Sequence, residues 1–467
     1  MRQQLVKADG SPARPRFRSW SVRMLVVLSV VMTPLVAGFA STSASAATAA
    51  TTSRYVVILK DGLSVAQVNA DATADGVTPS MTYSNAVSGF AGSMSSASLA
   101  KVTSNPDVVM VAPDVNFTST STHPHHISRG WIMGPGRRDC ATGAGNLGNG
   151  TTSYSGPDEF PPATAYQQFI PTNLERIDLQ CSPTAHIDGR GPGINEGVAV
   201  LDTGIQPNNS DLNVVGGVNC SDEAGSSWAD DYGHGTEVGG VLAAEDNGFG
   251  VVGAAPGARL YAVKVLDAED GGDLSNIICG VDWVTAHRNE ISVANMSLEG
   301  PGANDNDCGL KNHDALHYAI CRSVAKGVTY VVAAGNDSSS TNNVVPAAYP
   351  EVITVGGWSD TDGRPGGLGA TCDGNSDDVF AQFSNSGPSV DLMAVATCIT
   401  STYNDNTLVF DDGTSFASPA VAGAAADLLS RFPGIGPEGV KLYLQATGEY
   451  GDLINNHGYG LLDMNRD

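Results

Sequence analysis

Basic residues are scarce in this chain of 467 residues, in which 24 Lys and Arg stand against 49 Asp and Glu, a formal net charge of −25. A negative charge repels phosphate backbones, so we expect no nucleic-acid partner. Charged residues make up 16% of the chain and hydrophobic residues 41%, a balance that excludes a globally disordered protein. The sequence also lacks a repeat of fixed period and a long coiled-coil pattern.

Long hydrophobic runs are lacking too, with one exception at residues 24–40. This apolar stretch follows a basic segment and precedes the small residues A-S-A at 44–46. The combination predicts a secretory signal peptide at 1–46, and hence a secreted, extracellular protein without stable membrane association. A membrane anchor is the alternative, because the stretch is near the lower length limit for a membrane span.

Cysteines occur without any C-x-x-C pair, and all eight lie beyond the expected signal. An even count in an exported chain favours disulfides over zinc ligation. The pairings local in sequence are Cys308 with Cys321 and Cys372 with Cys398, although the sequence leaves the connectivity open. The remaining cysteines are Cys140, Cys181, Cys220 and Cys279.

Two N-terminal segments differ from the rest of the chain. Residues 47–117 carry strand-like runs on either side of a helical region, which predicts a small α+β domain, and this domain could be an independent binding module. Residues 118–165 are rich in Thr, Ser, Gly and Pro and are typical of a linker or insertion. Within it, His123, His125 and His126 could bind a metal or belong to an exposed processing loop.

Residues 166–467 alternate short apolar strands with helical stretches. This alternation predicts an α/β domain with a doubly wound, mainly parallel sheet and helices on both faces. In such sheets the reactive residues lie at the carboxyl ends of strands. The expected strands are 198–201, 259–266, 292–296, 328–333 and 352–355. The expected helices are 234–244, 275–286, 314–326 and 415–431.

Four polar residues follow predicted strands or begin predicted helices. Each has an ordinary interpretation: Asp202 and Asn336 suit turns, His234 could be structural, and Ser415 could be a helix N-cap. Together they supply what acyl transfer to a hydroxyl requires. A serine becomes nucleophilic when an imidazole takes its proton, a carboxylate orients that imidazole, and an amide can stabilise the oxyanion.

The segments around these residues resemble those of the subtilisin-like serine proteases, from about residue 170 to the end of the chain. The resemblance is carried by V-L-D-T-G at 200–204, G-H-G-T at 233–236, N-M-S-L at 295–298, A-G-N at 334–336 and G-T-S-F-A-S-P at 413–419. It implies a serine endopeptidase with an acyl-enzyme intermediate. In such an enzyme Asp202 orients the imidazole and His234 is the general base. Ser415 is the nucleophile, and Asn336 donates a hydrogen bond to the oxyanion.

The resemblance also assigns residues 47–117 as an inhibitor-type propeptide, so that the protein is an autoprocessed zymogen inhibited by its own propeptide. It implies protein or peptide substrates, gripped as an added strand between Gly271 and Gly272 on one side and Ser297, Leu298 and Glu299 on the other. We expect no catalytic cofactor and a monomer.

Three residues depart from the family pattern: Glu237 replaces a usual His, Glu299 a usual Gly and Asp412 a common Asn. We hypothesise that the cleft is more negative than usual and prefers Arg or Lys in one pocket, unless Glu299 is simply solvated. Because His234 must be neutral to act as a base, we also expect activity to fall below about pH 6 to 7.

A calcium site is implied by the loop E-D-N-G-F-G-V at 245–251, with Asp211 and Asn247 as side-chain ligands. An ordinary Asn-Gly turn is the alternative. Two other protein classes remain open. One is a catalytically silent secreted binding protein, and the other is a lipase or esterase, which the lack of G-x-S-x-G around Ser415 disfavours.

Overall fold

The computed structural model describes residues 52–121, 168–189, 193–221, 225, 227–372, 374–449 and 460–466. The expected signal peptide, the His cluster at 123–126, most of the expected linker and Cys140 lie outside these residues.

An N-terminal four-stranded antiparallel sheet, in the order β2-β3-β1-β4, carries two helices. Helix α1 begins after Ser64, whose side chain forms a capping box with Gln67. Val57, Val68 and Phe90 are buried in a core of their own. This is the small α+β domain predicted from the sequence. Its elements are β1 (Ser53–Leu59), α1 (Val65–Ala74), β2 (Met81–Tyr83), β3 (Ser88–Met94), α2 (Ser96–Ser104) and β4 (Val108–Pro113).

The larger sheet runs in the order β15-β14-β12-β10-β6-β8-β7, with β16 also paired to β14. Its pairs are parallel except for the antiparallel β14–β15 pair, which confirms the predicted mainly parallel sheet. The bounds are β6 (Gly197–Asp202), β7 (Val214–Asn219), β8 (Arg259–Lys264), β10 (Val293–Met296), β12 (Thr329–Ala333), β14 (Ile353–Ser359), β15 (Val379–Phe380) and β16 (Leu392–Val395).

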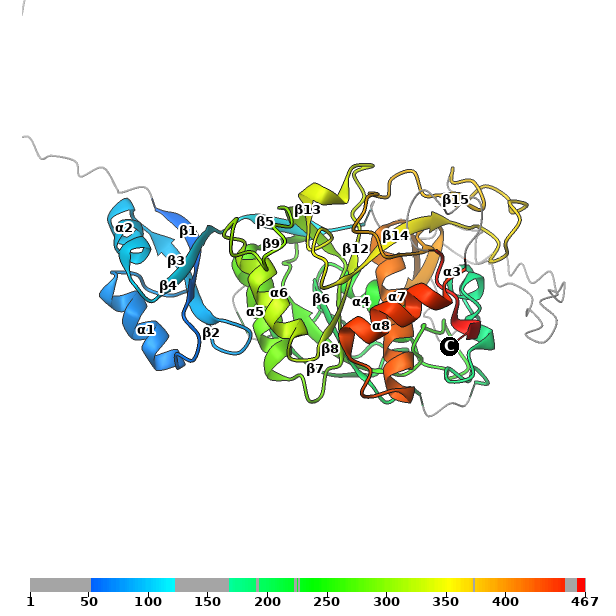
Figure 1. The fold of residues 1–467 in the computed structure, drawn as a ribbon. Helices are drawn as coiled ribbons and strands as arrows, with labels where there is room; N and C mark the ends of the chain where they lie inside the picture. Colours follow the sequence, from blue (N-terminus) through cyan, green and yellow to red (C-terminus); the bar gives the residue numbers. More distant parts are fainter. Residues whose placement is uncertain are drawn as a thin grey trace, which may run out of the picture. The chain divides into compact units, whose positions relative to one another are not determined.

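Helices lie on both sides of this sheet, with α5 and α6 on one side and α4, α7 and α8 on the other (Figure 1). Helices α4, α5, α6 and α7 begin and end within two residues of the bounds expected from the sequence, whereas α8 was not predicted. The long helices are α4 (His234–Ala243), α5 (Leu274–Ala286), α6 (Ala315–Val324), α7 (Thr414–Arg431) and α8 (Gly436–Thr447). Shorter ones are α3 (Thr172–Arg176) and the 3-10 turns η2 (Leu179–Cys181), η3 (Thr341–Asn343) and η4 (Met464–Arg466).

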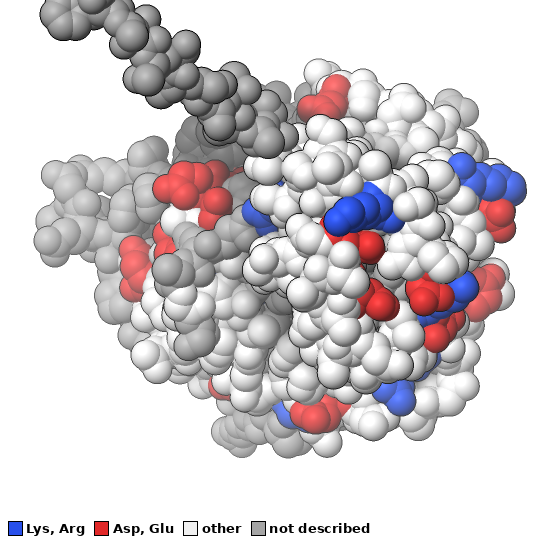
Figure 2. All heavy atoms as spheres, turned by 90° about the vertical axis from the view of Figure 1, so that its left-hand side faces the viewer, with Lys and Arg blue, Asp and Glu red and all other residues white. Residues whose placement is uncertain are grey.

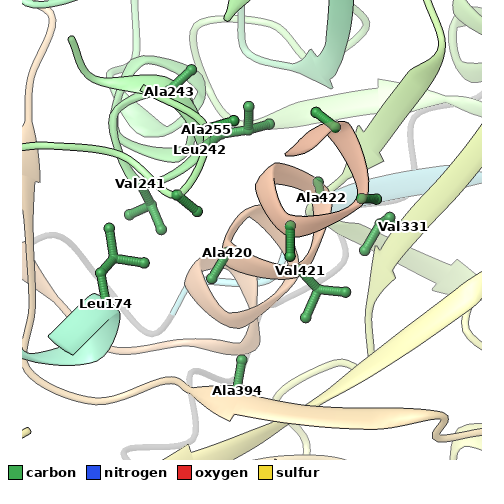
Figure 3. Packing of buried hydrophobic residues seen from close by; sticks show 14 of the residues in the cluster. Leu174, Val241, Leu242, Ala243, Ala255, Val331, Ala394, Ala420, Val421 and Ala422 are labelled. Carbon is green, nitrogen blue, oxygen red and sulfur yellow. The ribbon is translucent and has the colours of Figure 1, made fainter. Parts of the chain in front are cut away.

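Successive residues of the central strands pack into different cores. Val198 and Val200 belong to the cluster with α4, α7 and α8, whereas Ala199 and Leu201 belong to the cluster with α5 and α6. Because side chains alternate along a strand, a strand buried on both faces must be apolar throughout. Figure 3 shows Val421 and its neighbours on α7 packed between α4 and the sheet.

A second small sheet, in the order β13-β11-β5-β9, joins segments far apart in sequence. Its strands are β5 (Asn116–Ser119), β9 (Gly271–Asp273), β11 (Leu298–Pro301) and β13 (Val344–Val345). Strand β5 crosses the domain boundary expected at residue 117, because its hydrogen-bond partners come from β9 and β11 and not from nearby residues. A hairpin is formed by β17 (Ile399–Thr402) and β18 (Leu408–Asp411).

Disulfides link Cys308 to Cys321 and Cys372 to Cys398, which confirms both pairings expected from the sequence. A third joins Cys220 to Cys279, 59 residues apart. Closing a loop of the Cys308–Cys321 size contributes about 3 kcal/mol in the chain-entropy model.

Charged side chains of both signs are interspersed on the face drawn in Figure 2. None of the helices within the described ranges is both long and apolar enough to cross a membrane.

Candidate active site

Asp202 and His234 meet at the carboxyl end of the parallel sheet. Asp202 ends β6 and His234 begins α4, and His234 Nδ1 lies 2.7 Å from Asp202 Oδ1. Both side chains are buried. Since Nδ1 bonds the carboxylate, the ring is held in one orientation and Nε2 is left for the reacting partner. Nε2 is buried and makes no hydrogen bond within the described residues.

A second carboxylate, which the sequence reasoning missed, holds the turn that presents His234. Asp230 Oδ1 accepts the N–H of Gly233 at 2.7 Å and the hydroxyl of Thr203 at 2.9 Å. The same hydroxyl accepts the N–H of Gly235 at 2.9 Å. Asp230 therefore ties the residues on both sides of His234 to the residue after Asp202. In the sequence, Asp230 could have been singled out only because it lies four residues before His234.

Ser415 lies in the first turn of α7, where a proline opens a gap in the helical bonding. Pro419 has no N–H to donate to the carbonyl of Ser415, four residues earlier. The hydroxyl of Ser297 donates to that carbonyl instead, at 2.8 Å. The ring of Phe416 packs 5.8 Å from the ring of His234. The first turn of α7, which carries Ser415, is thus held by the Ser297 hydroxyl and packs against the imidazole of His234.

Asn336 is oriented by the residue before Ser415. Its Oδ1 accepts the backbone N–H of Thr414 at 3.0 Å and the Thr414 hydroxyl at 2.9 Å. With its oxygen so bound, the amide N–H₂ points into the cleft, where it donates to the carbonyl of Thr120. Gly413 borders the same space, since a Cβ added there would lie 2.7 Å from the Thr120 oxygen.

Strand β5 occupies the cleft between β9 and β11. Thr118 pairs with Gly271 and with Glu299, and Ser119 pairs with Leu298. All five residues predicted to grip substrate lie beside this strand: Gly271, Gly272, Ser297, Leu298 and Glu299. The N–H of Thr120 donates to the carbonyl of Ser297 at 3.1 Å, and its Oγ1 lies 2.7 Å from Ser415 Oγ.

The N-terminal domain is held to the larger one by polar contacts with α5. Asp282 accepts the backbone N–H groups of Asn85 and Ala86, each at 2.7 Å. The Tyr83 hydroxyl donates to the carbonyl of Ser275 at 3.0 Å, and Ser275 N–H donates to Asp114 at 2.8 Å. The domain is therefore placed so that β5 extends directly from it into the cleft.

The charges around His234 favour its protonated form. Burial lowers the pKa of the imidazole, but the Asp202 carboxylate and the more distant Asp270 and Asp411 outweigh burial and raise it to about 9. Glu237, one turn further along α4, is wholly buried, and neither carboxyl oxygen has a hydrogen-bond partner among the described residues. Burial and the charge of Asp411 raise its pKa well above the usual range, which favours the uncharged carboxyl.

The third departure, Asp412, is bound within the structure. It accepts the N–H of Cys398 and the side-chain amide of Asn375, each at 2.6 Å.

The expected calcium ligands lie together. Asp211 is buried, with Oδ1 3.0 Å from the side-chain nitrogen of Asn247 and Oδ2 3.1 Å from Val251 N. Burial raises the pKa of Asp211 to about 7. The Asp211 carboxylate is an oxygen ligand of the kind that calcium takes, but Asn247 presents its side-chain nitrogen to it, so the amide would have to turn over to present its oxygen to a cation. Gln168, which accepts Gly248 N–H at 2.6 Å, is a neighbour that the sequence reasoning missed.

In the part of the chain that the structure describes, two further groups of His, Cys, Asp or Glu side chains have their potential metal-ligand atoms within 4.8 Å of one another. The first contains Asp360, Asp362 and Asp377, but Arg176 already pairs with Asp360 at 2.9 Å. The second joins His317 and Glu351 to Cys308 and Cys321, whose sulfur atoms form a disulfide.

Comparisons with known proteins find relatives of both domains. The model described as the subtilase family matches residues 193–461, and that described as peptidase inhibitor I9 matches residues 36–119. Subtilisin E of Bacillus subtilis (strain 168) is 37% identical over 305 residues, covering 65% of this chain and 72% of its own. Subtilisin DY of Bacillus licheniformis is 39% identical over 277 residues, covering 58% and 90%.

Among solved structures, a cold-adapted subtilisin-like serine proteinase matches 62% of this chain and 96% of its own, at 30% identity and a TM-score of 0.49.

Proposed function

Because the chain belongs to the subtilase family of serine proteases, we propose that it is a secreted zymogen that first cuts its own chain after Thr120 and then hydrolyses extracellular proteins through an acyl-enzyme. The observation that carries this proposal is the position of Thr120. Its carbonyl accepts from the side chain of Asn336, and its Oγ1 is 2.7 Å from Ser415 Oγ. The bond between Thr120 and Ser121 is therefore the one presented to the nucleophile.

The four groups supply each step of the proposed reaction. His234 Nε2 takes the proton of the Ser415 hydroxyl as its oxygen attacks the Thr120 carbonyl carbon, and Asp202 holds and stabilises the imidazolium. The negative charge that develops on the carbonyl oxygen is stabilised by the Asn336 amide and the Ser415 N–H. His234 then protonates the amine of Ser121 as the C–N bond breaks. Water hydrolyses the ester by the reverse proton transfers.

The covalent state of the mature protein tests the proposal. We expect N-terminal sequencing of freshly processed material to begin at Ser121, and a fluorophosphonate to label Ser415. A first cut elsewhere would contradict the assignment of Thr120. Absence of labelling, with casein left intact, would favour a catalytically silent binding protein. Hydrolysis of a short-chain ester without hydrolysis of casein would favour an esterase.

Autoprocessing should depend steeply on pH. Because the pKa of His234 is raised to about 9 with β5 in the cleft, the imidazole is protonated below that pH and cannot act as a base. We expect the rate of propeptide cleavage to fall about tenfold per pH unit below about pH 9, a higher limit than the ordinary histidine pKa suggests. Following cleavage of refolded precursor from pH 5 to pH 10 measures this. A rate independent of pH across that range would exclude His234 as the base.

Calcium bound by Asp211 and Asn247 should stabilise the folded protein. A cation that binds only the folded state raises stability by about 2.7 kcal/mol at one hundred times its dissociation constant. We expect exhaustive chelation to lower the midpoint of thermal unfolding of the processed protein by about 5 °C or more. The Asp211→Asn variant should lose most of this response. If neither chelator nor added calcium changes the midpoint of thermal unfolding, calcium does not bind at this site.

A further inference from the structure

Glu299 bridges the two segments that form the cleft beside Ser415. It lies on β11, opposite Thr118 of β5. Residues that face each other in an antiparallel pair project to the same side, and successive residues alternate. The side chain of Glu299 is therefore on the side of β5 that also carries Thr118 and Thr120, the residue that precedes the scissile bond.

On that side, the carboxyl of Glu299 reaches the loop that carries the oxyanion donor. A Cβ added to Gly335 would lie 2.2 Å from Glu299 Oε2, and the backbone N–H of Asn336 donates to the carboxyl. The side chain thus crosses the space between β11 and the segment that binds the Thr120 carbonyl. By the alternation of side chains along β5, the side chain before the scissile bond projects on this same side.

Among the described residues, the Glu299 carboxyl has no positively charged partner. Oε2 is buried without a hydrogen-bond partner, and within the described part of the chain Glu299 forms no ion pair. Burial and the negative charge of Asp337 raise its pKa to about 7, while the N–H of Asn336 acts in the opposite direction. The neutral amide of Asn385 also borders Gly335, since a Cβ added there would lie 2.2 Å from its nitrogen. Thr120 brings no charge to this site.

We propose that Glu299, assisted by Asp337, selects substrates with a Lys or Arg side chain immediately before the scissile bond. The inference rests on the proposed endopeptidase function and specifies its substrate class. A cationic side chain supplies what the buried oxygen lacks, a charged hydrogen-bond donor. Since Glu299 is neutral below about pH 7 and anionic above it, the selectivity increases with pH. Self-cleavage after a neutral threonine does not use this pairing.

The test compares two peptides that differ only before the scissile bond, one with Arg and one with its neutral isostere citrulline. The processed enzyme is used, and its concentration is set by active-site titration. We expect kcat/KM to favour Arg by about tenfold or more at pH 9, and the ratio to fall towards one at pH 6. Taking a ratio cancels the ionisation of His234, which affects both peptides equally.

Glu299→Gln should bring the ratio at pH 9 close to one. The matched control is Glu438→Gln, which removes the same charge from an exposed position on α8 and should keep the ratio. A ratio near one in the unaltered enzyme, or a high ratio that persists in Glu299→Gln, would overturn the proposal. A third result would also overturn it: the unaltered enzyme prefers threonine before the scissile bond, and the Glu299→Gly variant gains activity on peptides with a large apolar residue there. Glu299 would then act by filling space. Failure to cleave either peptide, together with absent fluorophosphonate labelling, would instead count against the endopeptidase function.

Discussion

Replacing Ser415 by alanine is expected to leave residues 52–120 covalently joined to the rest of the chain. The Thr120 carbonyl would still be held by Asn336, but no oxygen would be positioned to attack it. Loss of the nucleophile in a triad lowers kcat by about 10⁶-fold, so cleavage of added casein should be undetectable. Intact mass and casein hydrolysis measure the two effects.

The matched control for this variant lies on the same helix. Ser430 is exposed near the end of α7 and donates to the carbonyl of Asp427. Ser430→Ala should process and cleave casein as the parent does. A Ser415→Ala precursor that is still cut after Thr120, in purified form and at a rate independent of its concentration, would mean that another group performs the attack.

Replacing Asp202 by asparagine should lower kcat by about 10⁴-fold without displacing the neighbouring side chains. Asp202 Oδ1 accepts from His234 Nδ1 at 2.7 Å and from the Thr203 N–H at 2.7 Å. An amide that donates to Nδ1 would place the histidine proton on Nε2, the atom that must accept from Ser415. Rates of propeptide cleavage and of peptide hydrolysis both report the loss.

The same variant has a second readout. Asp202 is the largest of the charges that raise the pKa of His234, so its removal should move the pH limit of cleavage from about 9 towards the ordinary histidine value of about 6.5. Asp405→Asn, at an exposed turn, serves as the control and should change neither quantity. If Asp202→Asn kept both the rate and the pH limit, Asp202 would have no role in orienting the base.

Much of the fold could be predicted because its signals are local. Apolar runs such as 198–201 mark strands buried on both faces, and the structure places β6 there, one residue longer at each end. Helix α8 and the hairpin of β17 and β18 were not predicted. Helix α8 has only Val440 and Leu444 buried, so its apolar pattern is weak, and each hairpin strand has only four residues.

The reacting residues of the candidate site could be predicted from the sequence, but the residues that hold them in position could not. Asp202, His234, Asn336 and Ser415 lie in short motifs that can be recognised without knowing the fold. Asp230 and Asn385 act by holding loops, and neither lies in one of the motifs recognised in the sequence. Asn385 Oδ1, for example, accepts the N–H groups of Asp337 and Ser339 and so shapes the segment that follows Asn336.

Sequence alone determined the class of this protein: a mainly parallel α/β enzyme with an N-terminal inhibitor-like domain and the four groups needed for acyl transfer. The fold class follows from the periodicity of the apolar runs, whereas the enzyme class, the inhibitor-like domain and the roles of the four groups follow from short motifs that resemble those of the subtilisin-like serine proteases. Only the tertiary structure decided that Thr120 lies against the nucleophile, that Glu237 is buried, and that Glu299 reaches across the cleft. Each of these depends on which distant segment supplies the neighbours, and a carboxyl group's charge and role are set by those neighbours.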